Sequence, residues 1–282
     1  MLAFAIAAGA LAYGCGTGGA SAVIDPVADA AQTTTGAAGA RMAMHMQVSI
    51  SGLPQVISMD AGGHMSFKGQ EGELSMQMNG LPGAAAGAFG EGGTIEERFV
   101  GGKVFMRAPG LAEKLQPGTS WVDVDIGAAA KKLGLDPQAL SRGQSNPAQF
   151  LEYLRASGGS VMVTGSQRVR GVETTRYSGT IDLRKVPGAD SGAAKEGVDK
   201  IVSMMGTSTI PVQAWVDGKK LIRRFSLTMP ISVAGEHVET EITVEFFDFG
   251  PQHPVQAPPA SATYELPAGA ATGLDSAPGS GA

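Results

Sequence analysis

The clearest repeating pattern in the chain is Met44-His45-Met46-Gln47-Val48-Ser49-Ile50, in which apolar and polar side chains alternate. Successive side chains of a β-strand point to opposite faces of the sheet, so a period of two predicts a strand with one buried and one solvated face. Sheets with one solvated face are typically antiparallel. The chain is therefore predicted to contain an antiparallel sheet whose core face carries methionines.

Similar patterns further along the chain bring the predicted total to about eleven strands. Besides the first strand, which begins at Arg41, they cover residues 56–68, 72–79, 95–100, 103–107, 121–126, 160–169, 172–183, 211–217, 219–233 and 236–249. Most are joined by short turns such as Gly101-Gly102, and strands joined so closely pair antiparallel. A sheet of this size twists and curls, and its inner face needs cover.

Helical patterns between the strands are candidates for that cover. A short helix is expected from Asp25-Pro26 to about residue 34, because Asp is a favourable N-cap and Pro fits the first turn. Further helices are expected over residues 127–133, 136–142, 147–157 and 190–205. The predicted fold class is α+β and mostly β: a curved antiparallel half-barrel of about eleven strands, with helices covering the concave face.

The N-terminal segment resembles an export signal that ends in a lipidation site. Residues 2–12 are uncharged and apolar, and the run is too short to span about 30 Å of hydrocarbon. Cys15, the only cysteine, follows the small residue Gly14, as in a lipobox. Ala12 stands where Leu is usual, and the first basic residue is Arg41, so we expect the true start codon to lie upstream. The alternative is an ordinary cleaved signal with an incidental cysteine.

These features divide the chain into four segments. We expect a signal peptide over residues 1–14, a lipidated tether over 15–24 and one folded domain over 25–250. Residues 251–282 are rich in Pro, Ala, Gly and Ser, and this composition predicts a mostly disordered tail. A single cysteine excludes an intramolecular disulfide, so the fold must be held by its core.

Composition and motifs argue against several function classes. The net charge is −5 and the basic residues are dispersed, whereas nucleic-acid binders carry a clustered basic face. The four histidines are scattered without metal-ligand spacing, and no G-x-S-x-G motif occurs. Asp123 and Asp125 alternate with Val122 and Val124, which indicates a solvated outer strand face. We therefore expect a binding protein, with no enzymatic activity, metal or cofactor.

The order of elements behind the lipobox resembles the LppX/LprG-type bacterial lipoproteins, which are similar in fold to the periplasmic lipoprotein carrier LolA. The resemblance is carried by Asp25-Pro26, Thr33-Thr34, Ala40-Arg41-Met42 and the strings VGGKVFMR (100–107), WVDVD (121–125), VRGVET (169–174), YSGTIDL (177–183), PVQAWVD (211–217) and FFDFG (246–250). It implies a protein anchored by acyl chains on Cys15 to the outer face of the cell membrane. It also implies that the protein binds an acylated lipid or lipoglycan and carries it across the envelope, with an envelope transporter as a possible partner.

A lipid-binding cavity is expected between the sheet and the helices. Its candidate lining is Met44, Met46, Val48, Met76, Met78, Val104, Met106, Val122 and Val124 on the strands, with Phe150, Leu151 and Leu154 on helix 147–157 as a lid. A void lined this way is apolar and suits acyl chains. Two alternatives remain open: the same residues form a filled core, or the chain is a structural or sensory envelope lipoprotein with a protein partner.

Overall fold

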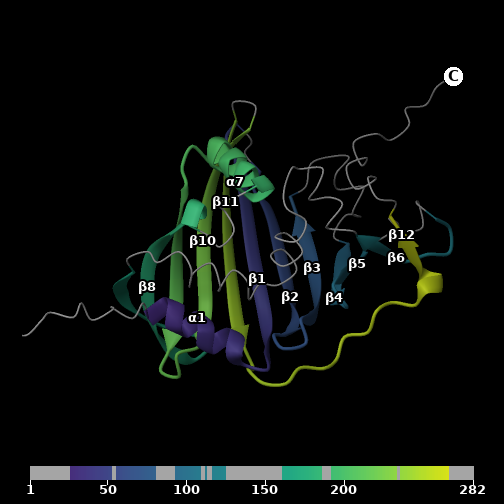
Figure 1. Cartoon of the computed structure of the whole chain (residues 1–282), viewed down its shortest axis with the longest axis horizontal. Helices are drawn as coiled ribbons and strands as arrows, with labels where there is room; N and C mark the ends of the chain where they lie inside the picture. Colours follow the sequence, from purple (N-terminus) through teal and green to yellow (C-terminus); the bar gives the residue numbers. More distant parts are fainter. Residues whose placement is uncertain are drawn as a thin grey trace, which may run out of the picture.

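The computed structural model describes residues 26–52, 55–80, 93–108, 112, 116–124, 161–185, 192–233 and 236–266. Within them, twelve strands form one sheet in the order β12-β6-β5-β4-β3-β2-β1-β11-β10-β9-β8-β7 (Figure 1). Neighbouring strands pair antiparallel, except that β12 pairs parallel to β6. The predicted fold class is confirmed.

The eleven predicted strands are all present, and a twelfth follows them. Their bounds are β1 Gly39–Ile50, β2 Ile57–Ser66, β3 Glu71–Asn79, β4 Thr94–Val100, β5 Lys103–Arg107, β6 Trp121–Val124, β7 Met162–Val169, β8 Val172–Asp182, β9 Thr209–Asp217, β10 Ile222–Val233, β11 Glu236–Phe247 and β12 Thr263–Glu265. Gly101 and Gly102 form the expected tight turn between β4 and β5, with φ of 62° and 75°. A two-residue turn of this kind needs positive φ at both positions, which glycine adopts without steric cost.

Two of the predicted helices lie within the described residues. They are α1 (Pro26–Gly36) and α7 (Gly192–Met205), and short 3₁₀ turns occur at Leu183–Lys185 and Ala260–Ala262. The helices expected over 127–133, 136–142 and 147–157 lie outside the described residues, as do the predicted signal segment and tether over 1–24.

Both described helices lie over the half of the sheet formed by β8 to β11 (Figure 1). We call the face that they cover the inner face and the opposite one the outer face. Val27, Ala30 and Ala31 of α1 and Met205 of α7 belong to one buried cluster with inner-face strand residues. The strand residues in this cluster include Ile210, Val212, Phe225, Leu227, Val244 and Phe246. This half of the inner face is therefore a filled hydrophobic core.

Helix α1 is held to the sheet by a buried hydroxyl. The side chain of Thr34 is fully buried, and its Oγ1 donates to the carbonyl of Ala30 at 2.7 Å. The same oxygen accepts the backbone N–H of Ile222 at the start of β10, at 2.9 Å. Because that N–H is buried, it needs this partner.

The C-terminal segment corrects the expectation of a disordered tail. Residues 251–266 run along one end of the sheet and reach its far edge, where β12 adds to β6 (Figure 1). The carbonyl of Gln256 accepts from Arg98 at 3.2 Å, and the backbone N–H of Ser120 donates to Ala262 at 2.9 Å. Val255 is buried. The composition of this segment lacks a hydrophobic period, but partners far away in the sequence order it. Residues 267–282 lie outside the described residues.

Replacing Thr34 by Val is expected to lower the free energy of unfolding by about 1–3 kcal/mol, because the isosteric side chain leaves the Ile222 N–H without an acceptor. Denaturant titration measures the change. Thr33→Val is the matched control, since Thr33 makes the same kind of bond to Asp29 on the exposed side of the helix. Equal losses in the two variants would contradict the buried role of Thr34.

Candidate functional site

The register of the sheet brings the predicted strand residues onto the inner face in rows. Met44 lies opposite Ala61, which lies opposite Met76, which lies opposite Ile95. A second row contains Met46, Met59 and Met78. Beyond this second row, Val48 of β1 pairs with Ile57 of β2. Further along the same face, Met106 of β5 pairs with Val122 of β6, and Val104 pairs with the backbone of Val124.

Five methionines gather in this part of the sheet. We call the set Met44, Met59, Met76, Met78 and Met106, with Ala61, Ile95 and Ala108, the methionine cluster. Met76, Ala61, Ile95 and Ala108 are buried, and the other four methionines are half-buried. Methionine side chains are unbranched and polarisable, so a surface made of them adapts to apolar partners of variable shape. The cluster therefore differs from the close-packed core under α1 and α7.

Several members of the cluster were not among the predicted site residues. Met59 and Ala61 alternate with polar or small residues in β2. In β4, Ile95 shares a face with Phe99, and both alternate with the charged residues Glu96 and Arg98. This period of two was the signal that placed them on the inner face. In contrast, Cys15, Phe150, Leu151 and Leu154 lie outside the described residues, and of Val124 only the backbone pairing is described.

Glu97 is the one charged residue among the inner-face positions of β1 to β6 in the described part of the chain. It lies opposite Leu74 of β3 and Met106 of β5. Its neighbours on the same face of β4, Ile95 and Phe99, are buried. Its sequence neighbours face the outer side, where Glu96 pairs with Arg107 and Arg98 with Glu73.

Burial raises the pKa of the Glu97 carboxyl above its ordinary value. The cause is desolvation, which disfavours the charged form. No described hydrogen bond or ion pair offsets it, and the inner-face neighbours on β3 and β5, including Leu74 and Met106, are not titratable. A partly buried carboxyl for which the described residues supply no partner thus interrupts an apolar surface.

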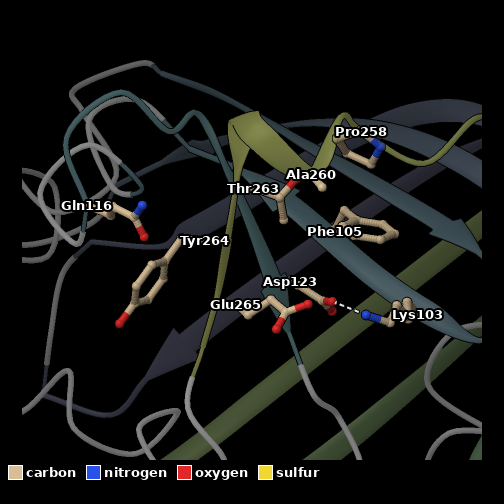
Figure 2. Close-up of a pocket in the computed structure, with 9 residues that line it drawn as sticks. All are labelled: Lys103, Phe105, Gln116, Asp123, Pro258, Ala260, Thr263, Tyr264 and Glu265. Carbon is tan, nitrogen blue, oxygen red and sulfur yellow. Dashed lines mark hydrogen bonds and ion pairs between the residues drawn. The ribbon is translucent and has the colours of Figure 1, made fainter.

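The outer face carries two hollows that are lined in part by charged side chains. One, of about 610 Å³, is lined by His45, Asp60, Arg170 and Glu245 among others, and His45 pairs with Asp60 at 2.7 Å. The other, of about 530 Å³, lies under β12. Figure 2 shows it, with Lys103 and Asp123 joined by an ion pair at 2.5 Å. Both hollows combine charged side chains with open access to solvent.

Asp123 corrects a sequence-based interpretation. Its carboxylate was expected on a solvated strand face, but Asp123 is only 8% exposed. It does face the outer side, as expected. The pairing of β12 with β6 covers it, with Glu265 opposite Asp123 in the register. Asp125 lies outside the described residues.

Within the described ranges, His, Cys, Asp and Glu side chains nowhere come together in threes as a metal ion would require. The helices in the same part of the chain are too short or too polar to cross a membrane.

Comparison with known proteins gives remote relatives. No protein-family model matches the chain. It is 26% identical over 218 residues, 75% of this chain and 70% of the relative, to an uncharacterised 31.2 kDa protein in the rplA-rplJ intergenic region of Streptomyces griseus. Among solved structures it is similar to the lipoprotein LppX of Mycobacterium tuberculosis, with 14% identity, a TM-score of 0.42, and coverage of 82% of this chain and 100% of LppX.

LprF of Mycobacterium bovis is a second similar structure, with 16% identity and a TM-score of 0.40 over 83% of this chain and 94% of LprF. The described residues form a mostly antiparallel, open half-barrel. That assignment rests on the chain's own strand order and on the helices over one face of the sheet.

Glu97→Gln is expected to stabilise the chain at neutral pH. A raised pKa means that the folded state binds the proton more tightly than the unfolded state, so the free energy of unfolding falls as pH rises above the ordinary value of 4.5. The side-chain amide of glutamine stays neutral, so the variant does not lose this free energy of unfolding as the pH rises. The stability advantage of the variant should therefore be present at neutral pH and disappear when the pH falls below 4.5.

Thermal or denaturant unfolding across this pH range measures the effect. Glu96→Gln is the matched control, because Glu96 is the adjacent residue and pairs with Arg107 on the outer face. It is not expected to stabilise the chain at neutral pH. A Glu97→Gln variant with the same pH profile as the parent chain would show that this carboxyl is not desolvated.

Proposed function

We propose that the chain is an exported envelope lipoprotein that binds the acyl chains of a lipid or lipoglycan on its inner face and carries that ligand across the cell envelope. The observation that carries the proposal is the methionine cluster, a half-buried apolar surface on the part of the sheet beside the core under α1 and α7. Sites for apolar ligands are typically concave and lined by apolar side chains.

The division of the inner face supports this role. Under the helices, inner-face side chains such as Phe225, Val244 and Phe246 are almost fully buried and leave no surface for a ligand. In the methionine cluster, Met44, Met59, Met78 and Met106 retain partial exposure. An acyl chain that covers them gains roughly 25 cal/mol for each Å² of apolar surface removed from water. The filled half then serves as scaffold and the methionine half as binding surface.

The proposed anchor explains how such a protein would meet its ligand. Acyl chains on Cys15 would hold the domain at the membrane surface, where lipids are taken up and released. Binding and release of a lipid need no chemical step, so no residue of the chain is assigned to catalysis.

A second candidate function is supported by the outer face. Its two hollows combine charged and apolar lining residues, and such surfaces suit contacts with a protein. In that case the chain is a structural or sensory envelope lipoprotein, the inner face is a filled core throughout, and the partner binds outside. Whether an acylated lipid copurifies with the protein from its own host separates the two candidates.

The carrier function predicts that protein purified from its own host contains an acylated lipid. Native mass spectrometry and lipid extraction measure it. Met78→Glu should strongly reduce the bound lipid, because it places a carboxylate in the methionine cluster. Gln77→Glu is the matched control, since Gln77 is exposed on the outer side of the same strand. Absence of lipid from the parent protein, or equal loss in both variants, would contradict the carrier function.

The anchor is tested separately. Cys15→Ser removes the thiol that a lipid would modify, so the variant should leave the membrane fraction and appear as exported, unanchored protein. Fractionation and the intact mass of the mature chain measure the change. A variant that remains in the membrane fraction would show that Cys15 is not the anchor.

A further inference from the structure

Glu97 occupies the boundary between the two apolar clusters of the inner face. On one side, Phe99 and Leu74 belong to the large filled core. On the other side, Ile95 and Met106 belong to the methionine cluster. The carboxyl therefore lies where the closed part of the inner face ends and the half-buried methionine surface begins.

This position is unfavourable for a carboxyl without a partner. Moving a polar group out of water costs free energy unless a hydrogen bond replaces the lost one, and an unpaired charge costs more. A leucine at position 97 would match the apolar residues around it and avoid the cost. Buried polar groups in folded proteins nearly always have partners, and no described residue of this chain supplies one to Glu97.

We infer that Glu97 recognises the polar part of the bound ligand, through an amine or hydroxyl that donates a hydrogen bond to its carboxyl. This inference rests on the proposed function and specifies the ligand further. The ligand is an amphiphile whose acyl chain covers the methionine cluster and whose donor group lies beside Glu97.

The burial of the residues around Glu97 indicates the direction in which the acyl chain of the ligand extends. Beyond Glu97 toward Phe99, the inner-face residues Phe99 and Val104 are buried in the core, and so is Leu74, which lies opposite Glu97. Toward Ile95 the register leads to Met76 and then to the half-buried pair Met59 and Met78. The apolar part of the ligand therefore extends from Glu97 toward Met78.

The chemistry of the carboxyl also defines what the site rejects. An ammonium group forms an ion pair with a carboxylate, and a hydroxyl donates to it, whereas a second carboxylate repels it or must take up a proton. Charge-assisted hydrogen bonds are about twice as strong as neutral ones. Amphiphiles should therefore bind in the order amine, then hydroxyl, then carboxylate.

The test uses three single-chain probes of equal chain length: tetradecylamine, monomyristoylglycerol and myristate. Each displaces an apolar fluorophore from the purified, delipidated chain at neutral pH, below the concentration at which it forms micelles. We expect the amine to bind at least about tenfold more tightly than myristate, as one charge-assisted hydrogen bond implies. Monomyristoylglycerol should fall between them.

Three variants assign the preference to Glu97. Glu97→Leu should bind all three probes alike, and Glu97→Gln should lose the preference for the amine but keep binding of monomyristoylglycerol. Glu96→Gln, the outer-face control, should keep the full order. The unfolding curves of all variants confirm that each is folded.

The outcomes separate this inference from the proposed function. Displacement by all three probes without an order, or an order that persists in Glu97→Leu, would overturn the role of Glu97 while acyl binding stands. If no probe displaces the fluorophore and no lipid copurifies, the carrier function fails and the role of Glu97 fails with it.

Discussion

The register of β1 against its two neighbours is the constraint on which the rest of the structure depends. β1 lies near the middle of the sheet and pairs with β2 on one side and β11 on the other, with Met44 opposite Ala61 and Val244. A shift of one residue would move every methionine of β1 to the outer face and bring His45 and Gln47 onto the core. Because both faces of β1 are chemically distinct, the register is strongly specified. It aligns the apolar rows that continue across β2, β3 and β4.

The inner face that this register creates has two parts. One half is closed by helices, and in the other half the apolar side chains are only partly buried. The closed half is covered by α1 and α7 and is tied down by buried contacts such as the Thr34 hydroxyl between α1 and β10. The methionine half contains side chains that adapt at little cost, and Glu97 lies at its boundary with the closed half. A rigid scaffold beside an adaptable apolar surface is a suitable arrangement for a protein that takes up and releases an acylated molecule. The polar outer face, with its ion pairs at Asp123 and Glu245, remains available for other contacts.

Much of this could be predicted from local patterns. Alternation in 41–50, 72–79 and 103–107 was sufficient to place Met44, Met76 and Met106 on one face, because side-chain direction in a strand depends only on the local backbone. The prediction was wrong where distant segments decide the environment. Residues 251–266 have no hydrophobic period, yet Arg98, Ser120 and the edge of β6 order them. Asp123 was expected in solvent because β12, which covers it, had not been expected as a strand. The period of two places Glu97 on the same strand face as Ile95 and Phe99. That this carboxyl lies between two apolar clusters depends on which strands flank β4, and the sequence does not indicate them.

The amino-acid sequence alone therefore determined eleven of the twelve described strands and which of their side chains share a face, since these follow from backbone geometry and a period of two. Strand order, the addition of β12 and the position of Glu97 between two clusters became known only from the three-dimensional arrangement. They depend on contacts between segments far apart in the sequence, such as Arg41 with Phe247 where β1 pairs with β11 and Arg98 with Gln256. Such contacts form when the whole sheet closes its loops and buries its inner face together, and no local pattern records that outcome.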